Sequence, residues 1–177
     1  PRRGRCPNRK ADEPLISPDG KWNAYIKGYN LYIAPAGGKK GEGEIALTMD
    51  GNEKLRYDWR SLSWSPDSRK IATLKVNDVE RRRIPLIESS PSTQKQPILQ
   101  WRNYNKPGDV LSTSLPVLFD VESHKQVPLN TEIYSHQFSL YLTGWRGDSR
   151  GFTFEFNERG HQRYIVAEVN ASTGEIT

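Results

Sequence analysis

The sequence predicts an all-β fold: a partial β-propeller of about three four-stranded antiparallel meander blades, one of which carries a long insertion. Three observations support this prediction. A turn phrase built on Ser-Pro-Asp recurs, each copy is followed by alternating apolar and polar residues, and no stretch shows sustained helical periodicity. The copies are ISPDG from residue 16, WSPDS from residue 64 and WRGDS from residue 145, which mark the predicted blade starts.

Each copy combines residues that favour a tight turn. Proline presets φ at the second turn position, and the short Ser and Asp side chains bond to nearby backbone amides. The aspartates of the three copies are Asp19, Asp67 and Asp148. A set of carboxylates could indicate catalysis or metal binding, but their shared place in the repeat predicts that they are structural turn residues.

The spacing of the aspartates fits propeller blades. The first interval is 67 − 19 = 48 residues, within the roughly 40 to 50 residues of one blade. The second is 148 − 67 = 81 residues, which fits one blade plus an insertion of about 30 residues. The third copy is degenerate, because Gly147 replaces the proline and the alternation after it is shifted by one position.

Three strands are expected behind each turn. The residues expected to share one face of the first strand are Trp22, Ala24 and Ile26, then Ala72, Leu74 and Val76, then Phe152, Phe154 and Phe156. The second strand is expected within 30–35, 116–123 and 163–174, and the third within 44–51, 125–130 and 174–177. The apolar segment 133–145 is expected as an outer strand that leads into the third blade.

Two segments lie outside the blade pattern. Residues 1–14 are expected as a basic tail or linker ahead of the propeller fragment at 15–177. Residues 79–114 are expected as the insertion, an extended arm or hairpin that leaves the second blade. This insertion contains the charged run ERRR and several prolines, which disfavour a regular central strand. The prolines are Pro85, Pro91, Pro97 and Pro107.

Charge and composition narrow the classes of function. The first ten residues hold five basic side chains and no acid, so the other 167 residues balance 26 − 5 = 21 basic against 21 acidic side chains. We therefore expect no nucleic-acid partner. No apolar run approaches the roughly 20 residues of a membrane span. Cys6 is the only cysteine and can form no internal disulfide.

The sequence contains no catalytic or cofactor motif. It has no Gly-x-Ser-x-Gly elbow, no Walker loop and no Gly-x-Gly-x-x-Gly. His124, His136 and His161 are scattered and lack metal-ligand spacing. We therefore predict no catalytic residue, no metal site, no cofactor and no enzymatic activity of this chain on its own.

The stretch 58–121 carries a more specific pattern. It reads DWRSLSWSPDSRKIATLKVNDVERRRIPLIE, then WRNYNKPGD, then LPVLFDVES. This order resembles the N-terminal propeller of dipeptidyl peptidase IV-type serine peptidases, which belong to the prolyl oligopeptidase class. The matching elements are Asn77-Asp78, 85–88, 104–108 and 117–120, and FNERGHQRYIVAEVNASTG resembles a strand pair of the same family.

The resemblance implies a division of labour. In the family, an eight-bladed propeller caps an α/β-hydrolase domain that carries the Ser-Asp-His triad, limits access and anchors the substrate's free N-terminus. It thus implies three partners: a C-terminal hydrolase domain absent from this chain, a peptide substrate, and a second subunit reached through residues 79–114. It also implies an extracytoplasmic location, periplasmic or secreted. Since about three blades cannot close a ring, the chain is expected to be a piece of a longer one.

The family's substrate anchors are not matched. The family places a Glu-Glu pair after its Asp-Trp, but here Asp58-Trp59 is followed by RSLS, and the position of the anchoring arginine is Ala46. We therefore assign no substrate-binding residue: the specificity differs, the anchors lie elsewhere, or a catalytic partner has been lost. The alternative function is a TolB-like repeat propeller that only binds protein or glycan partners. The insertion favours the peptidase interpretation.

Overall fold

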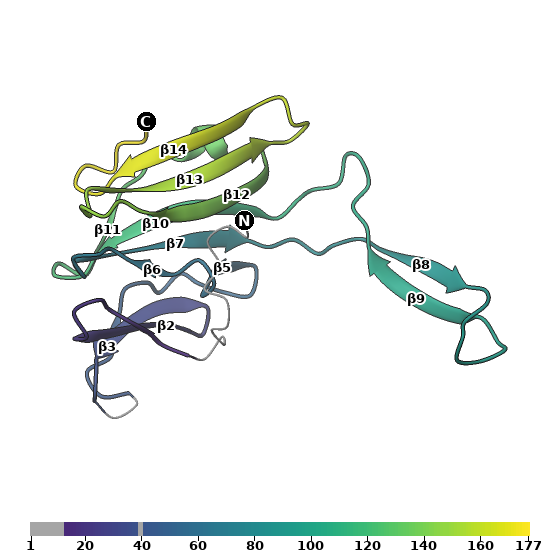
Figure 1. Ribbon diagram of the computed structural model, residues 1–177, viewed down its shortest axis with the longest axis horizontal. Helices are drawn as coiled ribbons and strands as arrows, with labels where there is room; N and C mark the ends of the chain where they lie inside the picture. The colour runs from purple at the N-terminus through teal and green to yellow at the C-terminus, as the bar shows by residue number, and fades with distance from the viewer. Residues whose placement is uncertain (1–12, 39–40) are drawn as a thin grey trace.

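The computed structural model describes residues 13–38 and 41–177 (Figure 1). In this part of the chain, three antiparallel sheets are stacked in chain order, and a two-stranded hairpin projects from the middle one. The one helical element among these residues is a 3-10 turn, so none of them forms a helix that could span a bilayer. The predicted basic tail, including Cys6, lies outside the described residues apart from Glu13 and Pro14.

The elements follow the predicted order of turns and strands. The first sheet holds β1 (Leu15–Ile16), β2 (Trp22–Lys27), β3 (Asn30–Pro35) and β4 (Ile45–Ala46), in that spatial order. The second sheet holds β5 (Leu55–Tyr57), β6 (Ser63–Trp64), β7 (Lys70–Asn77), β10 (Thr113–Asp120) and β11 (Lys125–Val127), in the order β11-β10-β7-β5 with β6 also paired to β7. The third sheet holds β12 (Gln137–Trp145), β13 (Gly151–Glu158) and β14 (Tyr164–Asn170), and the 3-10 turn η1 (Glu132–Tyr134) precedes it. The projecting hairpin is β8 (Arg83–Glu88) and β9 (Ile98–Asn103).

Short loops set the antiparallel registers. The two-residue loop between β2 and β3 places Gly28 and Tyr29 at φ values of 55° and 70°. Positive φ at both central positions matches the right-handed twist of the flanking strands, so β2 and β3 pair without a break from Trp22–Pro35 to Lys27–Asn30. The first and third sheets are meanders, as predicted, and in the second the chain leaves for the hairpin β8–β9 between the paired strands β7 and β10.

The second sheet is buried on both faces because it lies between the other two. One face of β7 and β10, including Ile71, Val117 and Phe119, packs against the first sheet. The other face, including Leu74 and Leu118, packs against the third sheet. In β7, both faces are therefore buried from Ile71 to Leu74, including the polar Thr73.

The structure corrects the predicted shift in the third copy. Ile71 and Phe152 both stand four residues after their turn aspartates, and both face the preceding sheet. Ala24 and Ala72 stand five residues after theirs and face the following sheet. The third copy therefore keeps its phase. Phe152 and Phe154 face the preceding sheet, whereas Ala24 and Ala72 face the following one, so the alternation in the third copy only looked shifted.

The segment 133–145 was assigned too early a strand start. Residues 132–134 form the turn η1, and the strand β12 begins at Gln137 and pairs with β13. The third strand predicted within 174–177 is reduced to a bridge between Val169 and Ile176. The two shorter counterparts, β4 and β11, pair with their sheets as expected.

The hairpin leaves and re-enters the second sheet between β7 and β10. Asn77 pairs with Thr113 at the end of that ladder, so the excursion spans residues 78–112, which we call the arm. Thr113 and Ser114, which the predicted insertion 79–114 included, belong to β10. In Figure 1 the hairpin β8–β9 lies well away from the three sheets.

Candidate functional site

The aspartates of the first two copies occupy equivalent turns. Ser17 Oγ donates to Asp19 Oδ1 (2.6 Å), and the Lys21 N–H donates to the same oxygen (3.2 Å). Ser65 Oγ donates to Asp67 Oδ1 (2.6 Å), and the Arg69 N–H donates to it as well (3.1 Å). The Ser17 hydroxyl, the main cause, lowers the pKa of Asp19. In both copies the carboxylate is bound within its own turn.

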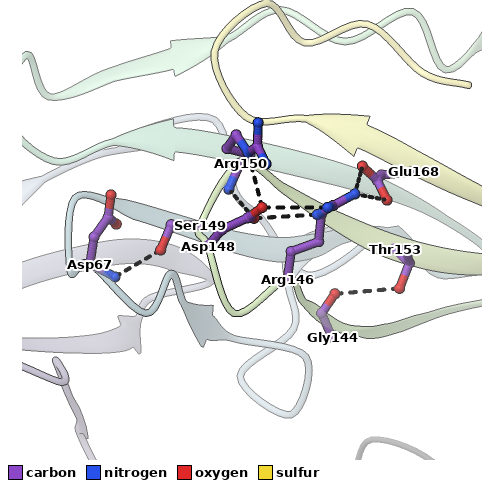
Figure 2. A network of polar contacts seen from close by, with 8 residues as sticks. All are labelled: Asp67, Gly144, Arg146, Asp148, Ser149, Arg150, Thr153 and Glu168. Carbon is purple, nitrogen blue, oxygen red and sulfur yellow. Dashed lines mark hydrogen bonds and ion pairs between the residues drawn. The ribbon is translucent and has the colours of Figure 1, made fainter.

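In the third turn Arg146 stands in place of the serine, and arginine side chains bind the aspartate instead of a hydroxyl. The Arg150 N–H donates to Asp148 Oδ1 (3.1 Å), and Arg150 Nε donates to Oδ2 (2.9 Å). Arg146 also contacts this carboxylate and reaches across to Glu168 (Figure 2). These bonds, led by the Arg150 N–H, lower the pKa of Asp148 to about 2. That all three aspartates serve structure and not chemistry stays a prediction.

The turns also join neighbouring sheets, which the sequence did not predict. Trp64 Nε1 donates to the Leu15 carbonyl (2.9 Å), and the Asp19 N–H donates to Ser68 Oγ (3.0 Å). Both bonds connect the second copy of the turn phrase to the first sheet. We call this pair of contacts, one from the indole and one to the hydroxyl, a clasp.

A second clasp joins the third copy to the second sheet. Trp145 Nε1 donates to the Ser63 carbonyl (3.4 Å), and the Asp67 N–H donates to Ser149 Oγ (3.0 Å; Figure 2). In each clasp the later copy supplies the indole and the hydroxyl, and the earlier copy supplies the carbonyl and the amide. The tryptophan that leads into the phrase and the serine that ends it therefore fasten each sheet to the one before it.

The clasp explains why a serine occupies a strained position. Gly20, Ser68 and Ser149 hold the same place in the three turns, with φ of 74°, 63° and 61°. Glycine adopts this left-handed region freely, whereas other residues pay about 1–2 kcal/mol. Serine is present only where its hydroxyl reaches the preceding sheet. The exchange of glycine for serine between copies was the signal in the sequence that could have revealed this contact.

The arm exposes an apolar face. Across its two strands Pro85 pairs with Trp101 and Ile87 with Leu99, so these four side chains share one side of the hairpin. Ile87 is 71% exposed, Leu99 57% and Trp101 52%. The Arg83 guanidinium lies over the Trp101 ring, 5.8 Å from its centroid. An exposed face of this composition on an isolated hairpin is typical of a protein contact.

Ion pairs hold the base of the arm. Arg82 Nε and Nη2 donate to the two carboxylate oxygens of Asp109 (3.0 and 2.8 Å), a bidentate pair. This pair is the main cause that lowers the pKa of Asp109 to about 2. Arg159, from the loop between β13 and β14, donates to the Asp109 carbonyl (2.5 Å). The arm is thereby tied to the third sheet as well as to the second.

The segment where the family carries its Glu-Glu pair is a tight turn here. The Asp58 carbonyl accepts from the Ser61 N–H (3.1 Å) and from Thr73 Oγ1 (3.0 Å). Ser61 Oγ in turn accepts from the Leu74 N–H (2.9 Å). These bonds hold the turn against β7. Ala46 lies in β4, so the position of the family's anchoring arginine carries no charge here, and the turn after Trp59 contains no glutamate.

Arg163, the main cause, and His136 lower the pKa of Glu158. In the part of the chain that the structure describes, His161 is the one histidine whose side chain forms a hydrogen bond, between Nδ1 and Asn157 Oδ1 (3.2 Å). No group of three His, Cys, Asp or Glu side chains among those residues is placed to hold a metal ion.

Known proteins match this chain in sequence and in fold. Residues 3–177 match the family described as dipeptidyl peptidase IV (DPP IV) N-terminal region. The fold is similar to that of dipeptidyl peptidase 4 from Porphyromonas gingivalis, with a TM-score of 0.66, 17% identity, and coverage of 93% of this chain and 24% of that chain. A Bacteroides ovatus protein provisionally assigned as a dipeptidyl aminopeptidase IV gives a TM-score of 0.61, 18% identity, and coverage of 94% and 23%.

These matches confirm the all-β propeller class, while the number of blades stays a prediction. The chain spans about a quarter of the length of each of the two solved structures. The family match, in contrast, extends over nearly the whole of this chain. The chain therefore belongs to the dipeptidyl peptidase IV N-terminal region family.

Proposed function

We propose that this chain is the non-catalytic N-terminal propeller domain of a dipeptidyl peptidase IV-like serine peptidase, in which it gates access to the active site and mediates subunit contacts. The family match and the similarity to two dipeptidyl peptidase folds support this proposal. Its first partner is a C-terminal α/β-hydrolase domain of the same polypeptide, and its substrate is a peptide. The proposed location is extracytoplasmic.

The exposed apolar face of the arm is the observation that best supports the proposed subunit contact. A two-stranded hairpin is at best marginally stable in water unless a further surface covers it. Here Ile87, Leu99 and Trp101 are all more than half exposed, on one side of the hairpin. Burying one such side chain fully is worth about 1.5–3 kcal/mol. A second copy of the arm would cover this face with the same apolar side chains, as a two-fold contact requires.

The stacked sheets support the proposed gating. Because both cores lie between the sheets, the stack is closed to solvent there and can wall off a neighbouring domain. A peptide reaches such a site in an extended form, whereas a folded protein is excluded. We assign no residue to substrate binding, because the turn at Asp58–Ser61 and the strand position of Ala46 offer no matched anchor.

Sedimentation velocity tests the subunit contact. Trp101→Ser and Ile87→Ser are expected to shift the protein from dimer to monomer at a concentration where the unaltered protein is dimeric. Arg102→Ser is the matched control, because Arg102 lies on the same strand but on the opposite side of the hairpin. An unaltered protein that stays monomeric, or a control that dissociates as readily as Trp101→Ser, would contradict the contact. The first outcome would favour a repeat propeller that binds other partners.

A further inference from the structure

A groove lies between the first and second sheets, at the end of the stack opposite to the arm. The turns that precede β2 and β7 and the turn that follows β10 form its walls, and β7 leads from this end of the stack to the arm (Figure 1). Its volume is about 640 Å³, within the roughly 300–1,000 Å³ of small-molecule sites. We call it the edge groove. Its lining includes the apolar residues Trp22, Ile45 and Val121 and the titratable residues Arg69, Glu122 and His124.

The apolar part of the edge groove is built around an indole. Trp22 and Ile45 are half-buried against the core between the first two sheets, and Val121 is buried in it. The indole N–H groups of Trp64 and Trp145 each donate to a carbonyl, but among the described residues Trp22 Nε1 donates to no acceptor. An apolar surface with a free donor suits a ligand that carries both an apolar group and a carbonyl oxygen.

The edge groove also holds a positive charge that the other two turns neutralise. Two positions after the turn aspartate, the three copies carry Lys21, Arg69 and Arg150. Lys21 pairs with Asp19 (3.7 Å), and Arg150 pairs with Asp148 (2.9 Å). In the part of the chain that the structure describes, the Arg69 side chain forms no ion pair and no hydrogen bond. Its guanidinium is therefore available to a ligand.

Glu122 supplies the opposite charge. The other carboxylates nearby are engaged: Asp120 pairs with Lys70 (2.9 Å), and Asp19 and Asp67 accept hydrogen bonds within their own turns. Glu122 forms no ion pair or hydrogen bond with any described residue. A free guanidinium and a free carboxylate in one groove are complementary to a ligand that carries both a carboxylate and an ammonium group. A neutral sugar would leave both charges unpaired, and a simple anion would leave the carboxylate unpaired.

We propose that the edge groove binds a short peptide with free ends. The terminal carboxylate of the peptide pairs with Arg69, its ammonium group pairs with Glu122, and an apolar side chain packs on Trp22. The groove lies at the end of the stack and not on an outer face of a sheet, so it is separate from both the arm and the flanks. The binding is a property of this chain alone and does not depend on the proposed peptidase function.

An NMR titration with the dipeptide Ala-Leu tests the proposal. The readout is the indole N–H signal of Trp22, which is assigned by its loss in Trp22→Phe. We expect this signal to shift with added peptide and to saturate. N-acetyl-Ala-Leu, which lacks the ammonium group, and Ala-Leu amide, which lacks the carboxylate, should each bind about two- to fivefold more weakly, as expected for the loss of one exposed ion pair.

Two charge-removing variants assign the ends of the peptide. In Arg69→Gln the amide cap should weaken binding no further while the acetyl cap still does, and in Glu122→Gln the reverse should hold. Arg69→Gln keeps the turn intact, because the backbone of residue 69 makes the bonds to Asp67 and Val121. Arg150→Gln is the matched control. It removes the same charge at the same place of the third copy and should bind Ala-Leu as the unaltered protein does.

Three results would overturn the inference. The first is the absence of a saturable shift of the Trp22 signal. The second is equally tight binding of a peptide capped at both ends, which would show a site for neutral ligands. The third is equal weakening by Arg150→Gln and Arg69→Gln, which would show an effect of net charge alone. Neither the arm nor a hydrolase domain enters these measurements, so a monomeric protein in sedimentation would leave the inference unaffected.

Discussion

The hydroxyl of Ser68 offers the sharpest test of how the sheets are joined. Ser68→Ala removes the acceptor of the Asp19 N–H, a bond of 3.0 Å, and keeps a β-carbon at a φ of 63°. The Ser68 side chain is buried, whereas Asp19, whose amide loses its partner, is an exposed residue. We expect a loss of about 1–2 kcal/mol in the free energy of unfolding. For a domain of this size that is a fall in Tm of roughly 2–8 °C.

Ser68→Gly separates the hydrogen bond from the backbone strain. Glycine loses the same hydrogen bond but removes about 1–2 kcal/mol of left-handed backbone strain. Its greater freedom in the unfolded chain lowers the stability of the fold by about 0.5–1 kcal/mol. The net loss should therefore be smaller than for Ser68→Ala, by roughly 1 kcal/mol. Gly20→Ser is the matched control. A β-carbon at Gly20 meets no atom within 4 Å, so this variant adds strain without a clash.

Urea unfolding of the three variants and the unaltered protein measures these differences. The expected order of stability places the unaltered protein first, Ser68→Gly next and Ser68→Ala last, with Gly20→Ser less stable than the unaltered protein. If Ser68→Gly is more stable than the unaltered protein, the hydroxyl contributes less than the strain costs. The clasp would then not explain why serine stands there.

Four further predictions concern the turns, the arm and activity. Asp67→Ala should lower the Tm more than Asp67→Asn, because the asparagine amide oxygen still accepts from the Arg69 N–H. Loss of function by Asp67→Asn at an unchanged Tm would show a chemical role for Asp67 instead. The stability difference between the unaltered protein and Asp109→Asn should be constant above about pH 5 and be largely lost as the pH falls towards 2. The Arg82 pair lowers the pKa of Asp109 from 3.8 to about 2, and a depressed pKa stabilises the fold only while the carboxylate is ionised; unfolding curves across this range measure it. Limited trypsin digestion should cut first within residues 81–95, and first cuts inside β10 would contradict an exposed arm. The chain alone should hydrolyse no Gly-Pro chromogenic substrate, and turnover blocked by a serine-directed inhibitor would refute this.

The sequence predicted the elements that depend on local chemistry. The turns at Asp19 and Asp67 and the strands behind them follow from residues within about ten positions of each other, and the structure contains them. The apparent shift in the third copy was wrong for a physical reason. Alternation shows that Phe152 and Phe154 share a face, but it does not show whether that face meets the preceding or the following sheet.

The clasps could not be predicted because they join distant positions. Trp64 and Leu15 are 49 residues apart, and Ser149 and Asp67 are 82 residues apart. Each group alone has an ordinary local explanation, the tryptophan as a core residue and the serine as a turn residue. Only the stacking of the sheets brings an indole to a carbonyl. The substrate site stayed unassigned for a different reason. No Glu-Glu pair follows Asp58-Trp59, and Ala46 occupies the position of the family's anchoring arginine.

The position of the arm between β7 and β10 has a consequence for the speed of folding. These strands first meet where Asn77 pairs with Thr113, so 113 − 77 = 36 residues of chain must be closed into a loop before the second sheet forms. Once β8 and β9 have paired, the 103 − 83 = 20 residues between Arg83 and Asn103 no longer count, and the effective loop is less than half as long. Halving a loop lowers its closure entropy by about 0.6 kcal/mol, roughly a threefold change in rate. Pairing of β8 with β9, far from the core, should therefore speed the pairing of β7 with β10 in the sheet that is buried on both faces.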